Sequence, residues 1–197
     1  MPGKILRRSI GEGGVVRLTV IEERFEGDVR RAYSLPAEAY ERLGAPAAGD
    51  YVDEETLSAI AEAEGQMKAT EKAVSLLSYG DNSCRGLYRK LRSRGYDSET
   101  AEAAVARMLQ KGYIREDEQA RRLVIACATR KLWGRRRIVA HLCEKGYDVA
   151  LSRRVIAEAE ADGEIDFTET AKELIEKKLG EDAPAEERRK LLYRYGY

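Results

Sequence analysis

Apolar side chains in the middle of the chain recur at every third or fourth position, as on one face of an α-helix. This pattern predicts helices over residues 85–94 and 98–111 and a shorter helix over 70–78. Because an amphipathic stripe has to be covered, we expect these helices to share one small core. The stripes consist of Cys84, Leu87, Tyr88 and Leu91, of Ala101, Val105, Met108 and Leu109, and of Ala73, Val74, Leu76 and Leu77.

The pattern returns after about fifty residues, a period typical of a helical repeat. Gly95-Tyr96-Asp97 recurs as Gly146-Tyr147-Asp148, and the chain reaches Gly196-Tyr197 where the motif begins a third time. In each copy we expect the glycine to end a helix in the left-handed conformation, the tyrosine to pack back on that helix and the aspartate to cap the next one. These are therefore predicted to be structural corners. The second unit should have helices over 118–131, 135–145 and 149–161.

A third unit is expected to begin at residue 166. By the spacing of the first two units its last helix should follow Tyr197, where the sequence stops. Either the sequence is shortened here or its natural end differs from the repeat pattern. In the first case we expect residues 185–197 to be loosely held, because their apolar stripe lacks a cover. The side chains expected to be partly uncovered are Leu191, Leu192, Tyr193 and Tyr195.

The first part of the chain follows a different pattern. Val16, Leu18 and Val20 alternate with polar residues, and 29–35 follows a turn at 26–28, which predicts a β-hairpin. Residues 11–14 are rich in glycine but lack the lysine and helix of a phosphate loop, so we expect a hairpin turn there. Short helices are expected from Pro36 to before Gly44, and over 54–64 with Asp53 as its cap.

These elements predict a mainly α fold of tandem three-helix units, similar to helix-turn-helix domains, in an elongated array. A small N-terminal β-hairpin with short helices precedes them. The expected parts are 1–66 for the N-terminal region, 67–115 for the first repeat, 116–165 for the second and 166–197 for the third, without its last helix.

Composition describes a folded, charged chain with 35 basic and 35 acidic residues. Its charge is segregated, because residues 68–161 are net basic and both flanks are net acidic. No apolar run approaches the ~18 residues of a membrane helix, and no secretory signal follows Met1, so we expect a cytoplasmic protein. Three cysteines without C-x-x-C spacing are expected to be buried hydrophobes: Cys84, Cys127 and Cys143.

No constellation of residues points to catalysis. His141 is the single histidine and has no metal-ligating neighbour at helical spacing. Glu158, Glu160 and Asp162 are spread over a helix end, and Asp117 is expected to be a cap or first-turn acid. We therefore expect no enzyme activity, no catalytic residue, no metal and no cofactor.

Several stretches together resemble the RecX regulatory proteins of bacteria. They are Tyr33-Ser34-Leu35, Gly49-Asp50 before an acidic helix, the paired Gly-Tyr corners, Gly112-Tyr113-Ile114 running into Asp117 and Ala120, and Gly134 to Ile138 before Leu142. The resemblance covers nearly the whole chain and is weakest over the first thirty or so residues. It implies three tandem three-helix repeats and no catalytic residues.

The resemblance further implies a protein that binds the RecA recombinase, in the groove of the RecA–DNA filament or at its growing end. Strand exchange, ATP hydrolysis and induction of the SOS response would then fall. The rival interpretation is a helix-turn-helix-type protein that binds DNA directly and without RecA. Balanced charge argues against it, although nonspecific contact with DNA is compatible with both hypotheses. We expect a monomer.

The contact surface is predicted from helical geometry. Arg85, Arg89 and Arg92 share one side of a helix, away from its apolar stripe, and Arg136 occupies the place of Arg85 in the second unit. Arginine suits such a surface because its planar fork binds carboxylate or phosphate through two bonds. The alternative is that these are ordinary solvated faces. Trp133 is expected to be a packing anchor rather than a base-stacking platform. The predicted partner-binding residues are Arg85, Arg89, Arg92, Arg130, Lys131, Arg135, Arg136 and Arg137.

Overall fold

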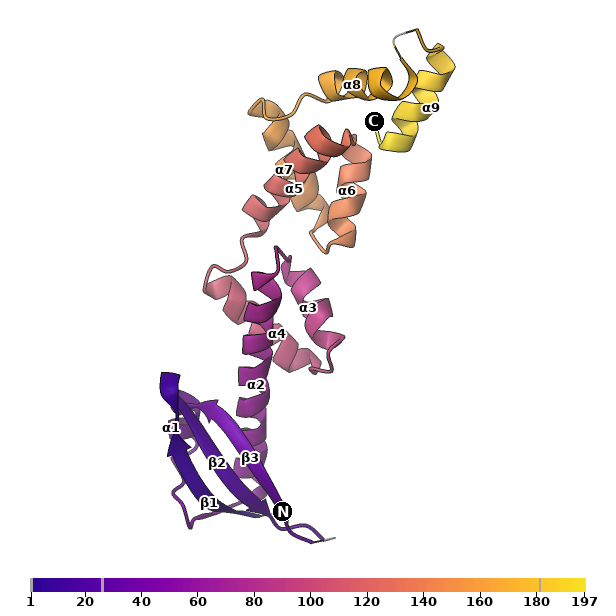
Figure 1. The fold of residues 1–197 in the computed structure, drawn as a ribbon. Coiled ribbons are helices and arrows are strands. Elements are labelled where there is room, and N and C mark those ends of the chain that lie inside the picture. The colour runs from indigo at the N-terminus through magenta and orange to yellow at the C-terminus, as the bar shows by residue number, and fades with distance from the viewer. Residues whose placement is uncertain (1, 26, 181) are drawn as a thin grey trace. The chain divides into compact units, whose positions relative to one another are not determined.

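The fold is known from a computed structural model that describes residues 2–25, 27–180 and 182–197 (Figure 1). It is mainly helical with a small antiparallel sheet at the N-terminus, as the sequence predicts. Residues 1–75 and 91–104 form one compact unit, and residues 76–90 and 105–197 form a second. Within the described part of the chain, no helix is both long and apolar enough to cross a membrane.

The sheet has four strands in the order β3-β2-β1-β4. Strands β2 (Val15–Glu22) and β3 (Val29–Pro36) form the predicted hairpin, and Glu26 of its expected turn lies outside the described residues. Two strands, β1 (Gly3–Ile10) and β4 (Tyr51–Val52), were not predicted. A bulge between Ile5 and Arg7 breaks the alternation that would have indicated β1. The turn expected at residues 11–14 joins β1 to β2.

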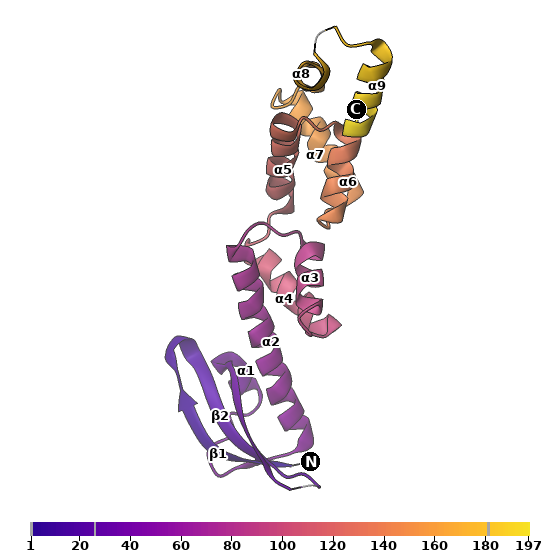
Figure 2. The ribbon, with the colours of Figure 1, turned by 45° about the vertical axis from the view of Figure 1, so that its right-hand side comes forward.

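Two helices cover the inner face of the sheet. The first, α1 (Ala37–Arg42), begins after Pro36 as predicted, and the second, α2 (Glu54–Ser78), begins after Asp53, whose carboxylate accepts the Thr56 amide at 2.8 Å. The helices expected over 54–64 and 70–78 are one continuous α2, which is a correction (Figure 2). Gly65 is the one residue there of low helix propensity, and a single glycine costs only ~1 kcal/mol. The expected division into parts, whose first boundary falls inside α2, remains a prediction.

Five further helices match the first two repeats to within a residue or two. They are α3 (Cys84–Arg92), α4 (Ser98–Gln110), α5 (Glu116–Lys131), α6 (Arg135–Glu144) and α7 (Val149–Ala161). The three corner glycines Gly95, Gly146 and Gly196 have φ of 89°, 95° and 92°, in the left-handed region. Asp97 accepts the Thr100 amide at 2.8 Å, and Asp148 accepts the Ala150 amide at 2.7 Å. Each of the three corners thus has a left-handed glycine, and the first two also have an aspartate that caps the following helix.

The second compact unit has a core built from α5, α6 and α7, in which Val124 and Ile138 are fully buried. Cys127 belongs to this core. Cys84 and Cys143 are only half-buried, so the expectation of three buried cysteines was right for Cys127 alone. Both residues lie near helix ends, where a side chain is less completely covered.

Helices α8 (Phe167–Leu179) and α9 (Ala185–Tyr195) follow the second repeat. The expectation that residues 185–197 are loosely held was wrong in one respect, because Leu191 is buried at 2% exposure among Leu132 and Leu174. Hydrogen bonds of the main chain and of a side chain hold the last residues as well. The Gly134 amide donates to the Tyr195 carbonyl at 2.9 Å, and the Tyr197 hydroxyl donates to Thr170 Oγ1 at 2.9 Å.

Candidate functional site

Hydrogen bonds join residues at the start of α3 to the end of α6, next to the second Gly-Tyr corner at Gly146-Tyr147. Ser83 Oγ donates to the Lys145 carbonyl at 2.8 Å and accepts the Gly86 amide at 2.9 Å. One turn further along α3, Arg89 Nη2 donates to the Glu144 carbonyl at 2.9 Å. The last carbonyls of a helix have no partner inside that helix, so Arg89 satisfies one of the carbonyls that end α6.

A similar arrangement is found one repeat later, between the start of α6 and the end of α9, although Arg136 aligns with Arg85 rather than with Arg89. The Arg136 amide donates to the Gly196 carbonyl at 3.0 Å, and Arg136 Nη2 donates to the Tyr193 carbonyl at 3.1 Å. A Cβ built on Gly134 would overlap the main chain of Gly196, so only glycine fits at this position. Arg89 and Arg136 are therefore exposed cations that also join one repeat to the next. The alternative that these arginines are ordinary solvated faces is therefore incomplete for Arg89 and Arg136, because each guanidinium also binds a main-chain carbonyl.

A shallow cleft of about 310 Å³ lies beside this second junction. Its lining includes three arginines, and no acidic side chain among the described residues lines it. The Arg136 guanidinium lies 4.4 Å from the centre of the Tyr193 ring, and the Arg137 guanidinium lies 5.2 Å from that of Tyr195. We call this the arginine cleft; it is lined by Arg136, Arg137, Tyr193, Arg194 and Gly196.

Arg194 was missed from the sequence. It lies on α9, in a segment whose net charge is acidic, so counting charge by segment hid it. The repeat register aligns Gly196 with Gly146 and therefore Arg194 with Glu144, which reverses the charge at this position. The repeat register could have shown that Arg194 reverses the charge at this position. That Arg194 lies beside α6 could be learned only from the tertiary structure.

Two predicted cations converge on Trp133. Lys131 Nζ and the Arg137 guanidinium each lie 4.4 Å from the centre of its ring, within the range of a cation–π interaction. Trp133 also packs against the core of the second unit, as predicted, and its ring meets His141 edge-on at 5.3 Å. Trp133 thus contacts both Lys131 and Arg137. Burial lowers the pKa of His141.

The other predicted cations differ in availability. Arg135 forms an ion pair with Glu160 and lies 4.3 Å from the centre of the Phe167 ring, so a partner would have to displace Glu160. Arg92 donates to the Tyr96 carbonyl at 2.8 Å. Arg85 and Arg130 are exposed, and neither side chain has a hydrogen bond, ion pair or ring contact with the described residues.

The acidic residues near these helices are held by ion pairs. Glu158, Glu160 and Asp162 pair with Arg154, Arg135 and Arg121, respectively. Asp117 lies in the first turn of α5, as predicted, and pairs with Arg154. The described residues contain no group of three acidic, histidine or cysteine side chains that could hold a metal ion.

A second basic surface, on the outer face of the N-terminal sheet, was also missed. Strand register places Lys4 and Arg30 on either side of Ile21, and Arg7 beside Thr19. Arg17 lies two residues along β2 from Thr19, so it is a diagonal neighbour of Arg7 at about 7–8 Å between Cα atoms. Arg7, Arg17 and Arg30 are exposed and form no ion pair within the described chain.

Comparison with known proteins shows similarity to one family. A family profile described as "RecX, first three-helix domain" matches residues 69–108. "Regulatory protein RecX" of Trichlorobacter lovleyi is 33% identical over 132 residues, which are 64% of this chain and 84% of that protein. The protein of the same name in Xanthomonas campestris pv. campestris strain B100 is 34% identical over 132 residues, 64% of this chain and 78% of that protein.

Two crystal structures share the fold. One, of a regulatory protein RecX, superposes with a TM-score of 0.73 over 99% of this chain and 94% of its own, at 19% identity. The other, of RecX from Lactobacillus salivarius, gives a TM-score of 0.57 over 68% of this chain and 90% of its own, at 18% identity. At such low identity the likeness concerns the fold alone.

Proposed function

This chain belongs to the RecX family of regulatory proteins, and we propose that it binds RecA or the RecA–DNA filament and inhibits its activity. The single observation that supports the contact is the arginine cleft, where three arginines lie together without a lining acid among the described residues. We expect a cytoplasmic, monomeric protein that acts by binding, with no catalytic step and no cofactor of its own.

The cleft suits an anionic partner for electrostatic reasons. A guanidinium binds a carboxylate or phosphate through two parallel hydrogen bonds, and such charge-assisted bonds are about twice as strong as neutral ones. Arg136 and Arg137 are held by aromatic rings, so less side-chain entropy is lost when a partner binds. Lys131 adds charge beside Arg137 across Trp133.

Inhibition follows if the bound chain occupies the surface that the second DNA strand must reach. Strand exchange and the ATP hydrolysis coupled to the filament would then decrease together. The chain has two similar junctions, each with an arginine bonded to a carbonyl near a helix end, at Arg89 and at Arg136, which suits a partner that repeats along a polymer. The partner-binding residues that we propose are those predicted from sequence, with Arg194 added.

The experiment that tests this function is RecA-driven strand exchange with increasing amounts of the chain. We expect inhibition, and we expect the double variant Arg137→Glu/Arg194→Glu to lose at least tenfold in potency. The matched control is Arg107→Glu/Arg153→Glu, which makes the same charge change at exposed positions outside the cleft. Equal potency of the two variants would exclude the cleft as the contact.

Direct binding to DNA is the second candidate, and the outer face of the sheet favours it. Lys4, Arg7, Arg17 and Arg30 offer four cations there that could contact phosphates. Such binding would weaken steeply with salt and would not need RecA. Replacement of Arg7, Arg17 and Arg30 by glutamate should remove it while strand-exchange inhibition persists.

A further inference from the structure

The outer face of the N-terminal sheet presents its side chains in rows that cross the strands. Paired residues of neighbouring strands point to the same face of a sheet. The residue before Ile21 on β2, Val20, is fully buried, so the row that contains Ile21 points away from the core. This row crosses all four strands and consists of Tyr51, Lys4, Ile21 and Arg30.

Two further rows continue the same face across β1, β2 and β3. No acidic residue stands in any of the three rows, which carry four cations. None of these cations forms an ion pair with a described residue, so the face keeps its positive charge and attracts anions. The second row consists of Arg7, Thr19 and Ala32, and the third consists of Ser9, Arg17 and Ser34.

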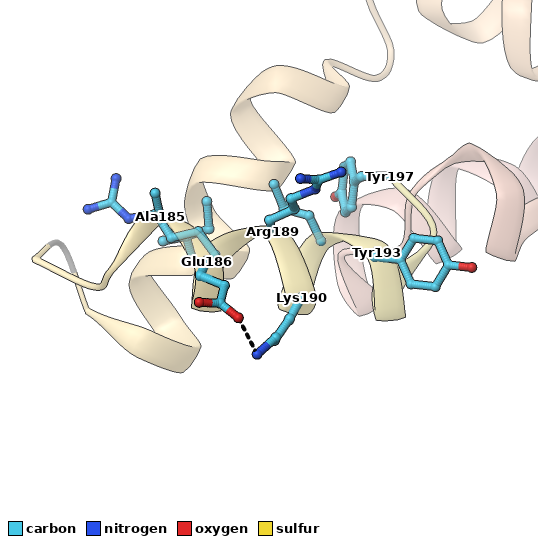
Figure 3. A pocket seen from close by; sticks show the side chains of 9 residues that line it. Ala185, Glu186, Arg189, Lys190, Tyr193 and Tyr197 are labelled. Atoms are coloured by element: carbon cyan, nitrogen blue, oxygen red, sulfur yellow. Dashed lines mark ion pairs between the residues drawn. The ribbon is translucent and has the colours of Figure 1, made fainter.

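Two other cationic surfaces of the chain are partly neutralised. The groove between α8 and α9 is lined by Arg189 and Lys190 but also by Glu186, which pairs with Lys190 at 2.6 Å (Figure 3). At the start of α6, Arg135 is paired with Glu160. A polyanion would compete with these carboxylates, whereas it meets none in the three rows of the sheet.

Tyr51 adds an aromatic ring to the cationic face. Its side chain is 65% exposed, and Lys4 Nζ lies 5.1 Å from the centre of its ring, within the range of a cation–π interaction. A single exposed tyrosine needs no special explanation. This one, however, shares its row with Lys4 and Arg30, so the face combines a ring that can stack with cations that can bind phosphate.

A single-stranded nucleic acid offers the groups that such a face binds. Its phosphates are anionic, and its unpaired bases have free ring faces on which a tyrosine can stack. In a duplex the bases are already stacked on one another. Four strands spaced by about 4.8 Å span roughly 14 Å, which is wider than the ~12 Å of a major groove, so the sheet would reach only the backbone of a duplex.

We propose that the outer face of the sheet binds single-stranded nucleic acid. A base stacks on Tyr51, and the phosphates on either side of it are bound by the cations of the three rows. Direct binding to DNA, the second candidate function, is the premise, and what is new is the single-stranded form of the ligand and the stacking role of Tyr51. Neither depends on RecA.

The test measures the fluorescence anisotropy of a labelled oligothymidylate of roughly 20 nucleotides, longer than the roughly 4–16 that one domain covers, with the full chain. A duplex of the same length is the comparison. At low salt we expect the single strand to bind at least fivefold more tightly than the duplex. The logarithm of its affinity should fall with that of the salt concentration with a slope of about −3, because each of four cations contributes about −0.7. This binding should therefore be weak at moderate salt.

Substitutions separate stacking from charge. Tyr51→Ala should weaken binding of the single strand at least fivefold without changing the salt slope, whereas Tyr51→Phe should retain it, because the ring and not the hydroxyl stacks. Arg30→Ala should make the slope less steep by about 0.7. The matched control is Tyr79→Ala, which removes a tyrosine that is 89% exposed and lies outside the sheet, and which should bind like the parent chain. Circular dichroism should show that all four variants are folded.

The possible results distinguish the form of the ligand from direct DNA binding itself. Equal or tighter binding of the duplex would overturn the single-stranded preference and leave direct DNA binding in place. Absence of binding to either probe would overturn both. Binding of the single strand that Tyr51→Ala leaves unchanged would exclude Tyr51 as the stacking residue and overturn the proposal. The contact with RecA is tested separately by strand exchange.

Discussion

Arg136 contacts Tyr193 in two ways: its Nη2 donates to the tyrosine's carbonyl at 3.1 Å, and its guanidinium lies 4.4 Å from the centre of the tyrosine's ring. One repeat earlier, Arg89 makes a similar bond to the Glu144 carbonyl, although it is Arg85 that aligns with Arg136. An arginine on one helix thus binds the end of a helix in the next repeat at both junctions. The two residues predicted as a binding surface are also part of the fold.

Charge reversal at the junctions should therefore lower stability. Arg136→Glu removes a charge-assisted bond and places a carboxylate beside the carbonyls that end α9, which is unfavourable near a helix C-terminus. We expect the free energy of unfolding to fall by about 1 kcal/mol or more, from urea denaturation. Arg85→Glu, at a position without a partner in the described chain, should change it by less than about 0.5 kcal/mol. Equal stability of the two variants would contradict the structural role of Arg136.

The two Gly-Tyr corners provide a matched pair of substitutions. Gly95 and Gly146 have similar φ of 89° and 95°, so alanine strains both by about 1–2 kcal/mol. Around Gly95 no atom lies within 4 Å of an added Cβ, whereas at Gly146 it would meet Ser83 Oγ at 2.7 Å and the Gly86 nitrogen at 2.9 Å. Gly146→Ala should therefore be clearly less stable than Gly95→Ala in thermal unfolding. Equal melting temperatures of the two variants would show that Gly146 is not as closely packed against Ser83 and Gly86 as described.

The buried hydroxyl of Tyr147 should make the fold lose stability at alkaline pH. Burial raises the pKa of its hydroxyl to about 12, compared with about 10 in an unfolded chain. The folded state therefore favours the neutral phenol, and the resulting stability is present below pH ~10 and is lost as the pH rises toward 12. Between pH 8 and pH 11, the free energy of unfolding measured with urea should decrease less for Tyr147→Phe than for the parent chain. An identical decrease would show that Tyr147 does not contribute.

Cys84 should react slowly with thiol reagents. Burial and the Glu116 carboxylate raise its pKa to about 11, so very little thiolate is present at pH 8. The Cys84 amide also donates to Glu116 Oε1 at 2.8 Å, which fixes the carboxylate nearby. Alkylation followed by peptide mass spectrometry should find Cys84 modified at least tenfold more slowly in the native chain than in urea. Replacing Glu116 by glutamine should accelerate the native reaction.

The helices of the first two repeats could be predicted because each has an apolar stripe and most are followed by a glycine; α5 instead ends at Leu132, which is itself left-handed. Local signals fix such boundaries, as the corners at Gly95 and Gly146 show. Strand β1 escaped prediction because its bulge interrupts the alternation, and the continuity of α2 escaped because Gly65 alone does not end a helix. These are cases in which tertiary packing outweighs local preference.

The candidate site was predictable only in part. Charge and helical spacing identified the exposed arginines of α3 and α6. Spacing could not show that Glu160 neutralises Arg135, or that Arg194 joins Arg136 from a helix more than fifty residues away, because these contacts depend on long-range packing. The basic face of the sheet likewise required the strand register, including the bulge after Ile5.

The most direct measurement is co-sedimentation of the chain with RecA in three states: RecA alone, single-stranded DNA alone, and filaments assembled with both and a nonhydrolysable ATP analogue. Our account predicts saturable co-sedimentation with assembled filaments that persists at moderate salt and is reduced by Arg137→Glu/Arg194→Glu. Failure to sediment with filaments, or equal binding to DNA without RecA, would contradict it.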